Sequence, residues 1–325
     1  MSLLIFNLLL LAASLVVIIF SSDKLIDSSS KIARFYGVPV FIIGVSIIAF
    51  GTSAPELVVG IISSIQKAND LSFGNIVGSC INNVGLILPI AAFMITVIVD
   101  EKILKKEMVM LTLIEILLIV YSVNGSLSRY EGGILILVGI LFIAYIVRGS
   151  QNPEQEYSDE DLKIEPKKLP LQFVTVIVSL LGLVFGGHFI VTSSTAVAEA
   201  LGIANSAIGL TLIALGTTMP ELVTTIAAAR RKEDDIILGN IIGSNIFNIL
   251  LVLGTAAFIH PIPISFKSES ILSSLGTDLG IMFVLNMFLY FTMVKNRSVR
   301  WTGGIVLIAI YIFYMTKQIY FMMPH

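Results

Sequence analysis

The sequence has few charged residues and almost no cysteine. Only 13% of its 325 residues are Asp, Glu, Lys or Arg, whereas 56% are hydrophobic, and the mean hydropathy is strongly positive. Because about a quarter of an ordinary soluble domain is charged, this composition predicts a multi-pass membrane protein. The single cysteine, Cys80, excludes an internal disulfide, a cysteine-based zinc cluster and a dithiol redox pair.

The sequence also lacks a basic surplus and the motifs of an enzyme. A net charge of −2 provides no positive field for nucleic acid, so we expect no nucleic-acid partner. With three histidines in the chain and no GxSxG phrase, no set of nucleophile, base and orienting group emerges. A membrane-embedded hydrolase is therefore disfavoured, and we predict neither an enzyme nor a bound cofactor.

Long apolar runs dominate what is present. A membrane-spanning helix needs about 20 residues, and ten segments of suitable length follow one another: 3–20, 36–65, 73–98, 107–123, 131–148, 170–191, 201–229, 236–260, 271–294 and 301–320. No basic residue precedes the first run, which favours a retained helix over a cleaved signal peptide. Such continuous runs do not fit the alternation of a membrane barrel, so the fold class is all-α.

The basic residues of the connections predict the orientation in the membrane. One set of alternate connections carries sixteen Lys and Arg residues, and the other set carries four. Because cytoplasmic connections are enriched in Lys and Arg, the sixteen lie inside the cell and both termini lie outside. We expect the protein in the cell membrane, functional as a monomer.

One hydrophilic connection, 149–169, divides the chain into residues 1–148 and 170–325. Its acidic cluster lacks the ligand spacing of an EF-hand loop, so we interpret it as a solvated cytoplasmic linker rather than a calcium sensor. Within the two parts, residues 46–88 and 211–253 align without a gap, and 20 of the 43 positions are identical. Each repeat unit spans five predicted helices, an odd number, so the two units should insert with opposite topology.

Each repeat places a proline and a glutamate inside an apolar segment, in "GTSAPELV" at 51–58 and "GTTMPELV" at 216–223. Proline lacks an N–H and crowds the carbonyl four residues earlier, so both helices should break and free carbonyl groups. Proline also suits the start of a new helix, where the dipole favours the carboxylates of Glu56 and Glu221. One proline would indicate only a kink; its recurrence beside glutamate predicts the discontinuous-helix cation site of secondary transporters.

A second motif follows each break and adds polar side chains. "GNIVGSCINN" puts Asn75, Ser79 and Asn83 on one helix face, and "GNIIGSNIFN" does the same with the residues Asn240, Ser244 and Asn248. The glycine pairs of these motifs allow close helix packing, so the polar stripes should face the protein interior. Carboxylate, hydroxyl, amide and carbonyl oxygens are the ligands of hard cations. Two carboxylates neutralise one Ca²⁺, whereas three Na⁺ would leave one positive charge.

Together, these motifs resemble the two α-repeats of the cation/calcium antiporter superfamily, most closely its sodium/calcium exchangers of prokaryotic type. The resemblance implies that Glu56 and Glu221 bind Ca²⁺ together with the backbone carbonyls of Thr52 and Thr217. It further implies flanking Na⁺ ligands at Ser53, Ser79, Thr218 and Ser244 and at the backbone of Ala49 and Ala214, with Asn83 and Asn248 at the centre.

Cys80 and Asn82 depart from the second repeat, which has Asn and Phe at the matching positions. Potassium-dependent relatives carry Asp where this chain has Asn248, which argues against K⁺ co-transport.

We therefore expect a secondary antiporter that exchanges Na⁺ for Ca²⁺ by alternating access, with both ions as transported substrates. A Ca²⁺/H⁺ antiporter on the same scaffold is the alternative, and a passive channel is disfavoured by the inverted repeat. Outside the motifs, Glu115 is interpreted as mainly structural, with a proton-linked role left open, and His188 and Asp278 are interpreted as interfacial.

Overall fold

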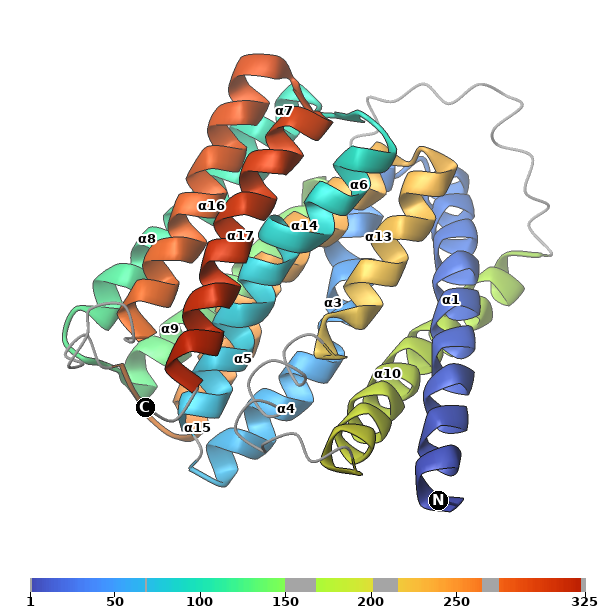
Figure 1. The fold of residues 1–325 in the computed structure, drawn as a ribbon. Helices are drawn as coiled ribbons and strands as arrows, with labels where there is room; N and C mark the ends of the chain where they lie inside the picture. The colour runs from blue at the N-terminus through green and yellow to red at the C-terminus, as the bar shows by residue number, and fades with distance from the viewer. Residues whose placement is uncertain (1, 68, 150–167, 201–215, 265–274, 323–325) are drawn as a thin grey trace.

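The computed structural model describes residues 2–67, 69–149, 168–200, 216–264 and 275–322, and nearly all of them are helical (Figure 1). The first part of the chain forms α1 (Ser2–Tyr36), α2 (Val40–Ile43), η1 (Gly44–Ile48), α3 (Ala49–Thr52), α4 (Ala54–Ile65), α5 (Asn69–Asn82), η2 (Asn83–Ile87), α6 (Leu88–Met94), β1 (Val97–Ile98), α7 (Glu101–Ile103), η3 (Leu104–Met108), α8 (Val109–Ser122), β2 (Ser126–Leu127) and α9 (Arg129–Gly149). The second part forms α10 (Leu169–Ala200), α13 (Met219–Arg231), α14 (Asp234–Phe247), η6 (Asn248–Leu253), α15 (Gly254–Ile259), β3 (Ile262–Pro263), α16 (Leu275–Asn296), β4 (Ser298–Val299) and α17 (Trp301–Met322). The elements labelled η are π-helical turns.

Six of the described helices are long and apolar enough to cross a membrane, or seven if the bent pair 40–52 and 54–65 is one span. A mostly helical membrane protein is thereby confirmed, while the count of ten spans remains a prediction. The start of the predicted span 201–229 and nearly all of the predicted linker 149–169 lie outside the described residues.

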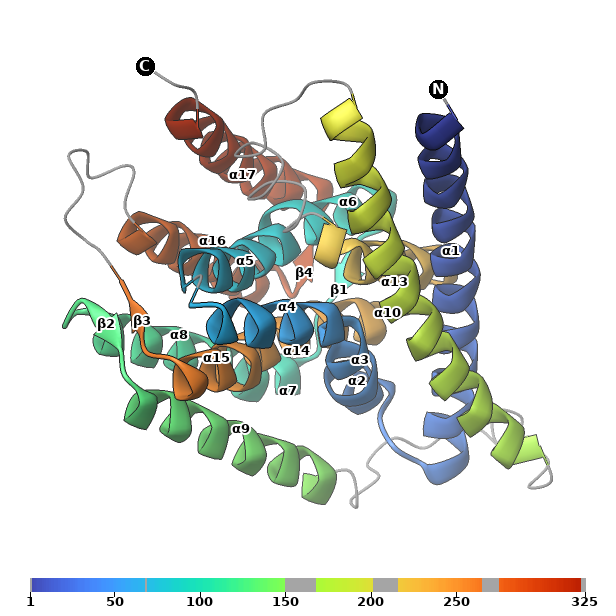
Figure 2. The same ribbon diagram turned by 90° about the horizontal axis from the view of Figure 1, so that it is seen from below.

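Two helices form the centre of the molecule. The apolar window of the span that contains α14 is 94% buried and that of the span that contains α5 is 83% buried, whereas the value for α1 is 22%. Seen from below, α5 and α14 lie in the middle, with α8, α9, α16 and α17 on the side away from α1 (Figure 2). The polar stripes of the two repeats are thus carried by the most buried helices of the chain.

The matching helices of the two repeats run in opposite directions. In Figure 1, α5 leads upward into α6, whereas α14 leads downward into α15. Two short antiparallel pairs also join the repeats, β1 with β4 and β2 with β3. Each pair joins an early strand of one repeat to a late strand of the other, as expected if the repeats are related by a two-fold axis.

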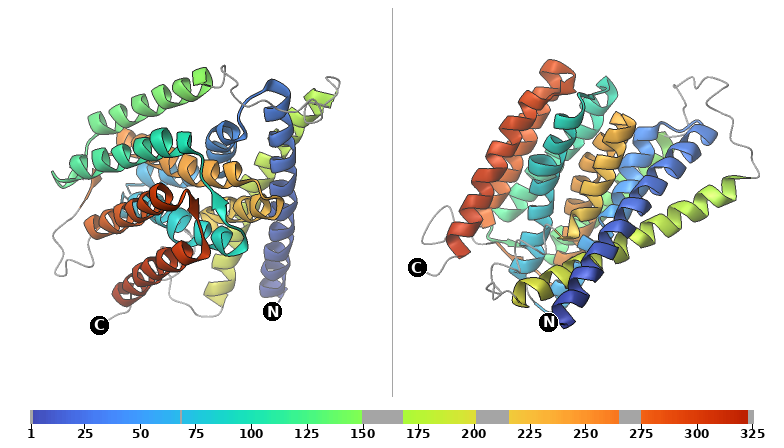
Figure 3. Two further views of the ribbon diagram at one scale, coloured as in Figure 1. Left: turned by 90° about the horizontal axis from the view of Figure 1, so that it is seen from above. Right: turned by 45° about the vertical axis from the view of Figure 1, so that its right-hand side comes forward.

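The helix α1 is longer than the sequence predicted. An apolar run at 3–20 defined the expected span, but the helix continues to Tyr36 through charged residues. At 1.5 Å per residue its 35 residues extend about 50 Å, well beyond the roughly 30 Å of a bilayer core. It packs mainly against α10, and the two helices lie together on one flank (Figures 2 and 3).

Close helix packing positions the first repeat against α14. A methyl group added to Gly239 would lie 2.9 Å from the Cα atom of Gly44, and one added to Gly243 would lie 2.8 Å from the Cα atom of Val45. Both contacts are with backbone, so only glycine permits this approach. The predicted close-packing role of the second glycine pair is confirmed.

Candidate cation site

The first Pro-Glu motif lies at a break between two helices. The segment 40–52 meets α4 at an angle of 44°, and Ser53 stands at the break with φ −81° and ψ 4°. Pro55 occupies the start of α4, so its missing N–H costs no helical hydrogen bond there. Glu56 lies in the first turn of α4 and is fully buried. The predicted break is confirmed, centred two residues before the proline.

The second motif repeats this geometry almost unchanged. Thr218 precedes α13 with φ −82° and ψ 2°, Pro220 stands at the start of the helix, and Glu221 lies fully buried in its first turn. The same residue pattern therefore yields the same local conformation in both repeats. Each carboxylate lies at the positive end of a helix dipole, which favours its charged form.

Hydroxyl groups surround the two carboxylates. Ser79 donates a hydrogen bond to Oε1 of Glu56 over 3.1 Å, and Ser53 donates one to Oε1 of Glu221 over 3.3 Å. Thr217 also hydrogen-bonds Glu56 across the repeats. Each glutamate is therefore contacted by a hydroxyl from the other repeat, and the two carboxylates lie near enough to repel each other.

Threonine–asparagine bonds join the two repeats in matching positions. The Thr52 hydroxyl donates to Oδ1 of Asn240 over 3.1 Å, and the Thr217 hydroxyl donates to Oδ1 of Asn75 over 3.3 Å. Thr52 also lies 3.4 Å from the Ser244 hydroxyl. These bonds hold each broken helix against the polar stripe of the other repeat.

Asn82 and Asn245, which were not among the predicted site residues, also connect the repeats. Nδ2 of Asn82 donates to the Thr218 hydroxyl over 3.2 Å, and Nδ2 of Asn83 donates to Oδ1 of Asn245 over 2.9 Å. Asn82 stands at a position where the second repeat has Phe247. That departure from the repeat was visible in the sequence, but its partner was not.

The backbone changes from α-helix to π-helix at the central asparagines. The turn η2 begins at Asn83 and η6 begins at Asn248, which are matching positions of the two repeats. Single π turns inside α-helices occur often at functional sites. Here they occur just after the polar stripe in both repeats.

Several buried oxygen atoms of this region have no hydrogen-bond partner among the described residues. They are Oε2 of Glu56, Oε2 of Glu221, Oδ1 of Asn83 and Oδ1 of Asn248. Buried polar atoms without partners are costly and rare, and a set of oxygens from carboxylates and amides suits a hard cation. In the described part of the chain, no group of three or more His, Cys, Asp or Glu side chains gathers, so neutral oxygens must complete any shell.

The structure brings together nearly all predicted site residues. Thr52, Ser53, Glu56, Ser79, Asn83, Thr217, Thr218, Glu221, Ser244 and Asn248 are all buried. Ala49 is buried too, and its carbonyl accepts a hydrogen bond from the Thr52 hydroxyl and one from the Ser53 N–H. Ala214 lies outside the described residues.

Asp278, which the sequence indicated to be interfacial, lies in the first turn of α16. It is 7% exposed and forms an ion pair with Lys317 of α17, while Gln318 donates to its other oxygen over 3.1 Å. The sequence did not predict this pairing, because a single carboxylate does not reveal a lysine 39 residues later. His188 is exposed.

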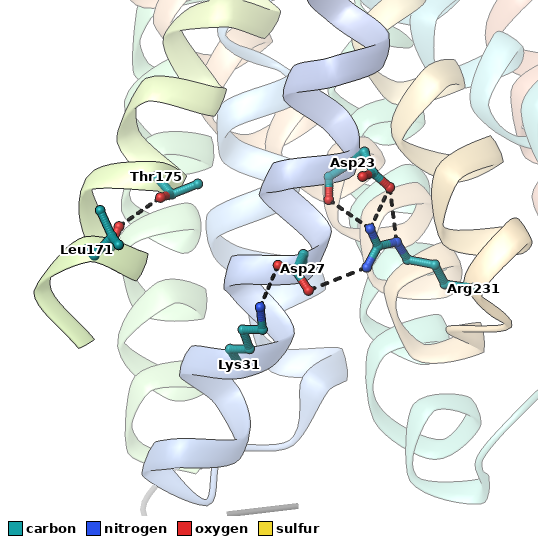
Figure 4. Close-up of polar contacts among 6 residues, drawn as sticks. All are labelled: Asp23, Asp27, Lys31, Leu171, Thr175 and Arg231. Atoms are coloured by element: carbon teal, nitrogen blue, oxygen red, sulfur yellow. Dashed lines mark hydrogen bonds and ion pairs between the residues drawn. The ribbon is translucent and has the colours of Figure 1, made fainter. Parts of the chain in front are cut away.

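An ion-pair cluster joins α1 to the end of α13 (Figure 4). The Arg231 guanidinium binds the carboxylate and the carbonyl of Asp23 and lies 3.6 Å from Asp27. Asp27 also pairs with Lys31 over 2.7 Å, and on α10 Thr175 donates to the Leu171 carbonyl. Hydrogen bonding to Asp23 raises the pKa of Arg231 further above its usual range, so this bridge stays charged at physiological pH.

Two helix breaks, each followed by a buried carboxylate in the first turn of the next helix and joined by hydrogen bonds to the polar stripe of the other repeat, define a membrane antiporter of the cation type. The chain belongs to the sodium/calcium exchanger family, because the family model described as sodium/calcium exchanger protein matches residues 6–148 and 171–320. As a member, it is a multi-pass membrane protein of the cation/Ca²⁺ antiporter class, a family of transporters and not of enzymes.

Relatives and solved structures extend the match to almost the whole chain. It is 31% identical to the sodium/calcium exchanger MaX1 of Methanosarcina acetivorans, over 97% of this chain and 99% of that protein. It is 35% identical to the inner membrane protein YrbG of Escherichia coli over 78% and 79% of the two chains. The structure of the sodium-calcium exchanger NCX_Mj soaked with 10 mM Na⁺ and zero Ca²⁺ superimposes with a TM-score of 0.85 at 28% identity, covering 96% of this chain and 99% of that one.

Proposed function

We propose that this protein exchanges Na⁺ for Ca²⁺ across the membrane, using one site that faces each side in turn. The observation that carries the proposal is a set of four buried oxygens that have no hydrogen-bond partner within the described ranges, one each from Glu56, Glu221, Asn83 and Asn248. A divalent cation bound by the two carboxylates would balance both of their charges. MaX1 and NCX_Mj, which carry the name of sodium/calcium exchangers, support the same cargo.

The proposed ligands divide into a centre and two flanks. In the centre, Ca²⁺ is held by Glu56 and Glu221 with the backbone carbonyls of Thr52 and Thr217. At the flanks, Na⁺ is held by the hydroxyls of Ser53, Ser79, Thr218 and Ser244 with the carbonyls of Ala49 and Ala214. The hydrogen bonds of Ser79 with Glu56 and of Ser53 with Glu221 support this division, because each places a hydroxyl beside a carboxylate.

Charge balance makes the exchange sensitive to voltage. The site carries two negative charges, so bound Ca²⁺ leaves it neutral, whereas three Na⁺ ions leave one positive charge. Moving one charge through the membrane potential is worth about 2.3 kcal/mol per 100 mV. A three-to-one exchange therefore runs faster with a potential that favours net charge movement.

Alternating access requires an architecture in which the site can open to either side. We assign ten spans in two inverted five-helix units, residues 1–148 and 170–325, with both termini outside the cell and the linker 149–169 inside. The opposite directions of α5 and α14 and the crossed strand pairs support this assignment. The two carboxylates then lie near the pseudo-symmetry axis, where substrate sites of inverted-repeat transporters occur.

Proton coupling is the competing mechanism on this scaffold. Protons need only the carboxylates, whereas Na⁺ needs a shell of oxygen atoms. The hydroxyls that hydrogen-bond both glutamates would have no part in proton exchange, and this favours Na⁺.

The test is Ca²⁺ uptake into proteoliposomes loaded with Na⁺ and diluted into Na⁺-free medium, with pH clamped and the potential set by a K⁺ ionophore. We expect uptake that requires the Na⁺ gradient and increases with an inside-positive potential. Uptake that ignores Na⁺ and follows an imposed pH gradient would overturn Na⁺ coupling, and uptake without any counter-ion would indicate a channel.

A further inference from the structure

A buried carboxylate lies outside the proposed cation site, between α8 and α16. Glu115 is fully buried, and Asn286 of α16 is fully buried opposite it. Nδ2 of Asn286 donates to Oε2 of Glu115 over 3.0 Å and to the Thr112 hydroxyl over 3.3 Å. These three side chains form one cluster in the contact between the two helices.

The cluster contains two oxygens that face no donor. Oε1 of Glu115 and Oδ1 of Asn286 are both buried without a hydrogen-bond partner among the described residues. Nor does any described Lys, Arg or His pair with Glu115. An ionised carboxylate would therefore sit uncompensated in an apolar interior, which is strongly unfavourable.

One proton resolves both difficulties. Placed on Oε1, it removes the charge and supplies a donor for the amide oxygen of Asn286. The acid and the amide then exchange two hydrogen bonds, since Oε2 already accepts from Nδ2. Every polar atom of the pair is satisfied in this state.

A proton fits this cluster better than a metal cation. The Thr112 hydroxyl donates to the Met108 carbonyl over 2.8 Å, and its oxygen faces the Asn286 amide hydrogens. Those amide hydrogens also cover Oε2 of Glu115. Only two oxygens remain, whereas Na⁺ requires several oxygen atoms to replace its water shell.

We propose that Glu115 and Asn286 form a proton-binding site in which Glu115 is a neutral acid while α8 and α16 are packed together. The inference does not depend on the proposed Na⁺/Ca²⁺ exchange, because the cluster shares no side chain with the cation site. Release of the proton leaves a buried charge facing an amide oxygen. High pH therefore acts against the packed arrangement of these helices, and low pH acts for it.

Other titratable groups lie on the helices around the pair. Cys80 of α5 interacts electrostatically with Glu115, and α16 packs against both α5 and α8. On α8 and the elements packed against it, the other described titratable or charged side chains are Tyr121 of α8, Lys105, Lys106 and Glu107 of η3, Asp278, Tyr290 and Lys295 of α16, and Asp234 and Asp235 of α14. None of these described side chains forms a hydrogen bond or ion pair with Glu115.

The direct test is infrared spectroscopy of the purified full-length protein at neutral pH, which detects the carbonyl stretch of a protonated carboxylic acid. We expect a band in the wild type that is lost in Glu115→Gln and shifted in Asn286→Ala. Glu101→Gln is the matched control, because Glu101 is exposed and hydrogen bonding to Lys105 lowers its pKa; its band pattern should equal that of the wild type. Identical bands in the wild type and Glu115→Gln would overturn the proposal.

Two further measurements separate a proton from Na⁺ and from a purely structural contact. The Glu115 band should be unaffected by added Na⁺, and its loss on Na⁺ titration would assign the site to Na⁺ instead. Glu115→Gln preserves both hydrogen bonds of the pair without a titratable group. The unfolding midpoint of the wild type should therefore fall more steeply at alkaline pH than that of this variant, and parallel pH profiles would contradict proton binding.

Discussion

Glu56 and Glu221 are the two residues on which the charge of the cation site depends. Both are fully buried and each has one oxygen without a partner in the described part of the chain. Their remaining oxygens accept hydrogen bonds from serine hydroxyls, Ser79 for Glu56 and Ser53 for Glu221. The hydroxyls hold the carboxylates in place but add no charge, so replacing either glutamate changes the charge balance directly.

Glu56→Gln and Glu221→Gln should each abolish Ca²⁺ transport without unfolding the protein. Each substitution keeps the shape and leaves Ca²⁺ with one uncompensated positive charge. Removing one partner of a buried charge pair costs about 3–5 kcal/mol, which is a loss of more than about 100-fold in affinity at 1.4 kcal/mol per tenfold. Calorimetric Ca²⁺ titration and radioactive Ca²⁺ uptake measure the effect.

Glu131→Gln is a suitable control for these variants, because Glu131 accepts a hydrogen bond from the Ser128 N–H at the start of α9 and lies outside the site. It should bind and transport Ca²⁺ like the wild type. Normal exchange by either purified Glu56 or Glu221 variant would rule out a shared site.

Among the elements, α14 has the tightest packing that the site requires. Its glycines Gly239 and Gly243 let η1 and α3 approach to backbone contact, and this contact carries Thr52 to Asn240. A side chain at either position would force a helix to shift, because a rotamer change cannot relieve a contact with backbone atoms. The polar contacts between the repeats therefore depend on two positions that have no polar atoms in their side chains.

Gly243→Ala should weaken both folding and Ca²⁺ binding. Its new methyl group would lie 2.7 Å from Cβ of Ala49 and 2.8 Å from Cα of Val45, and overpacking of this kind costs about 1–3 kcal/mol. Gly280→Ala in α16 is the control, since no atom of the described residues lies within 4 Å of its added methyl group. Thermal unfolding in detergent should give a lower midpoint for Gly243→Ala than for Gly280→Ala. Equal midpoints would show that α14 can accommodate the added methyl group.

The sequence predicted the broken helices and the polar stripes because both are encoded locally. Pro55 and Pro220 determine where a helix starts, and spacing alone puts Asn75, Ser79 and Asn83 on one face. The contacts of Asn82 with Thr218 and of Asn83 with Asn245 could not be predicted from the sequence. They depend on how two segments 136 and 162 residues apart meet, and a repeat alignment pairs matching positions rather than contacting ones.

Across the whole molecule, α1, which pairs with α10, is the least buried of the six described candidate spans. The two helices pack mainly on each other along one flank, and the apolar window of the α1 span is only 22% buried. Hydropathy could not predict the full length of α1, because its later turns carry charges, two of which bind Arg231 of α13 (Figure 4). This bridge ties the flank to a broken helix of the site.

Arg231→Gln should loosen α1 from α13 with little loss of global stability. Exposed ion pairs contribute about 0.2–1 kcal/mol, so the population of the joined state should change by up to about fivefold. Distances between spin labels on α1 and α13 would report it, and high salt should reproduce the effect in the wild type. The exchange of charges in Asp23→Arg with Arg231→Asp should restore the wild-type distances; a double variant as loose as the single one would refute the bridge.

The crossing contacts of the site have a consequence for how such a protein can evolve. The carboxylate of each repeat is contacted by a hydroxyl of the other. A mutation in one repeat therefore changes the surroundings of the carboxylate in the other repeat. Asn82 and Phe247 show that the copies have already diverged at one position, and the hydrogen bond of Asn82 ends on Thr218 of the other copy. Site residues of one half therefore cannot change independently of the other half. In related sequences, co-varying pairs of site residues should join the two halves more often than they lie within one half.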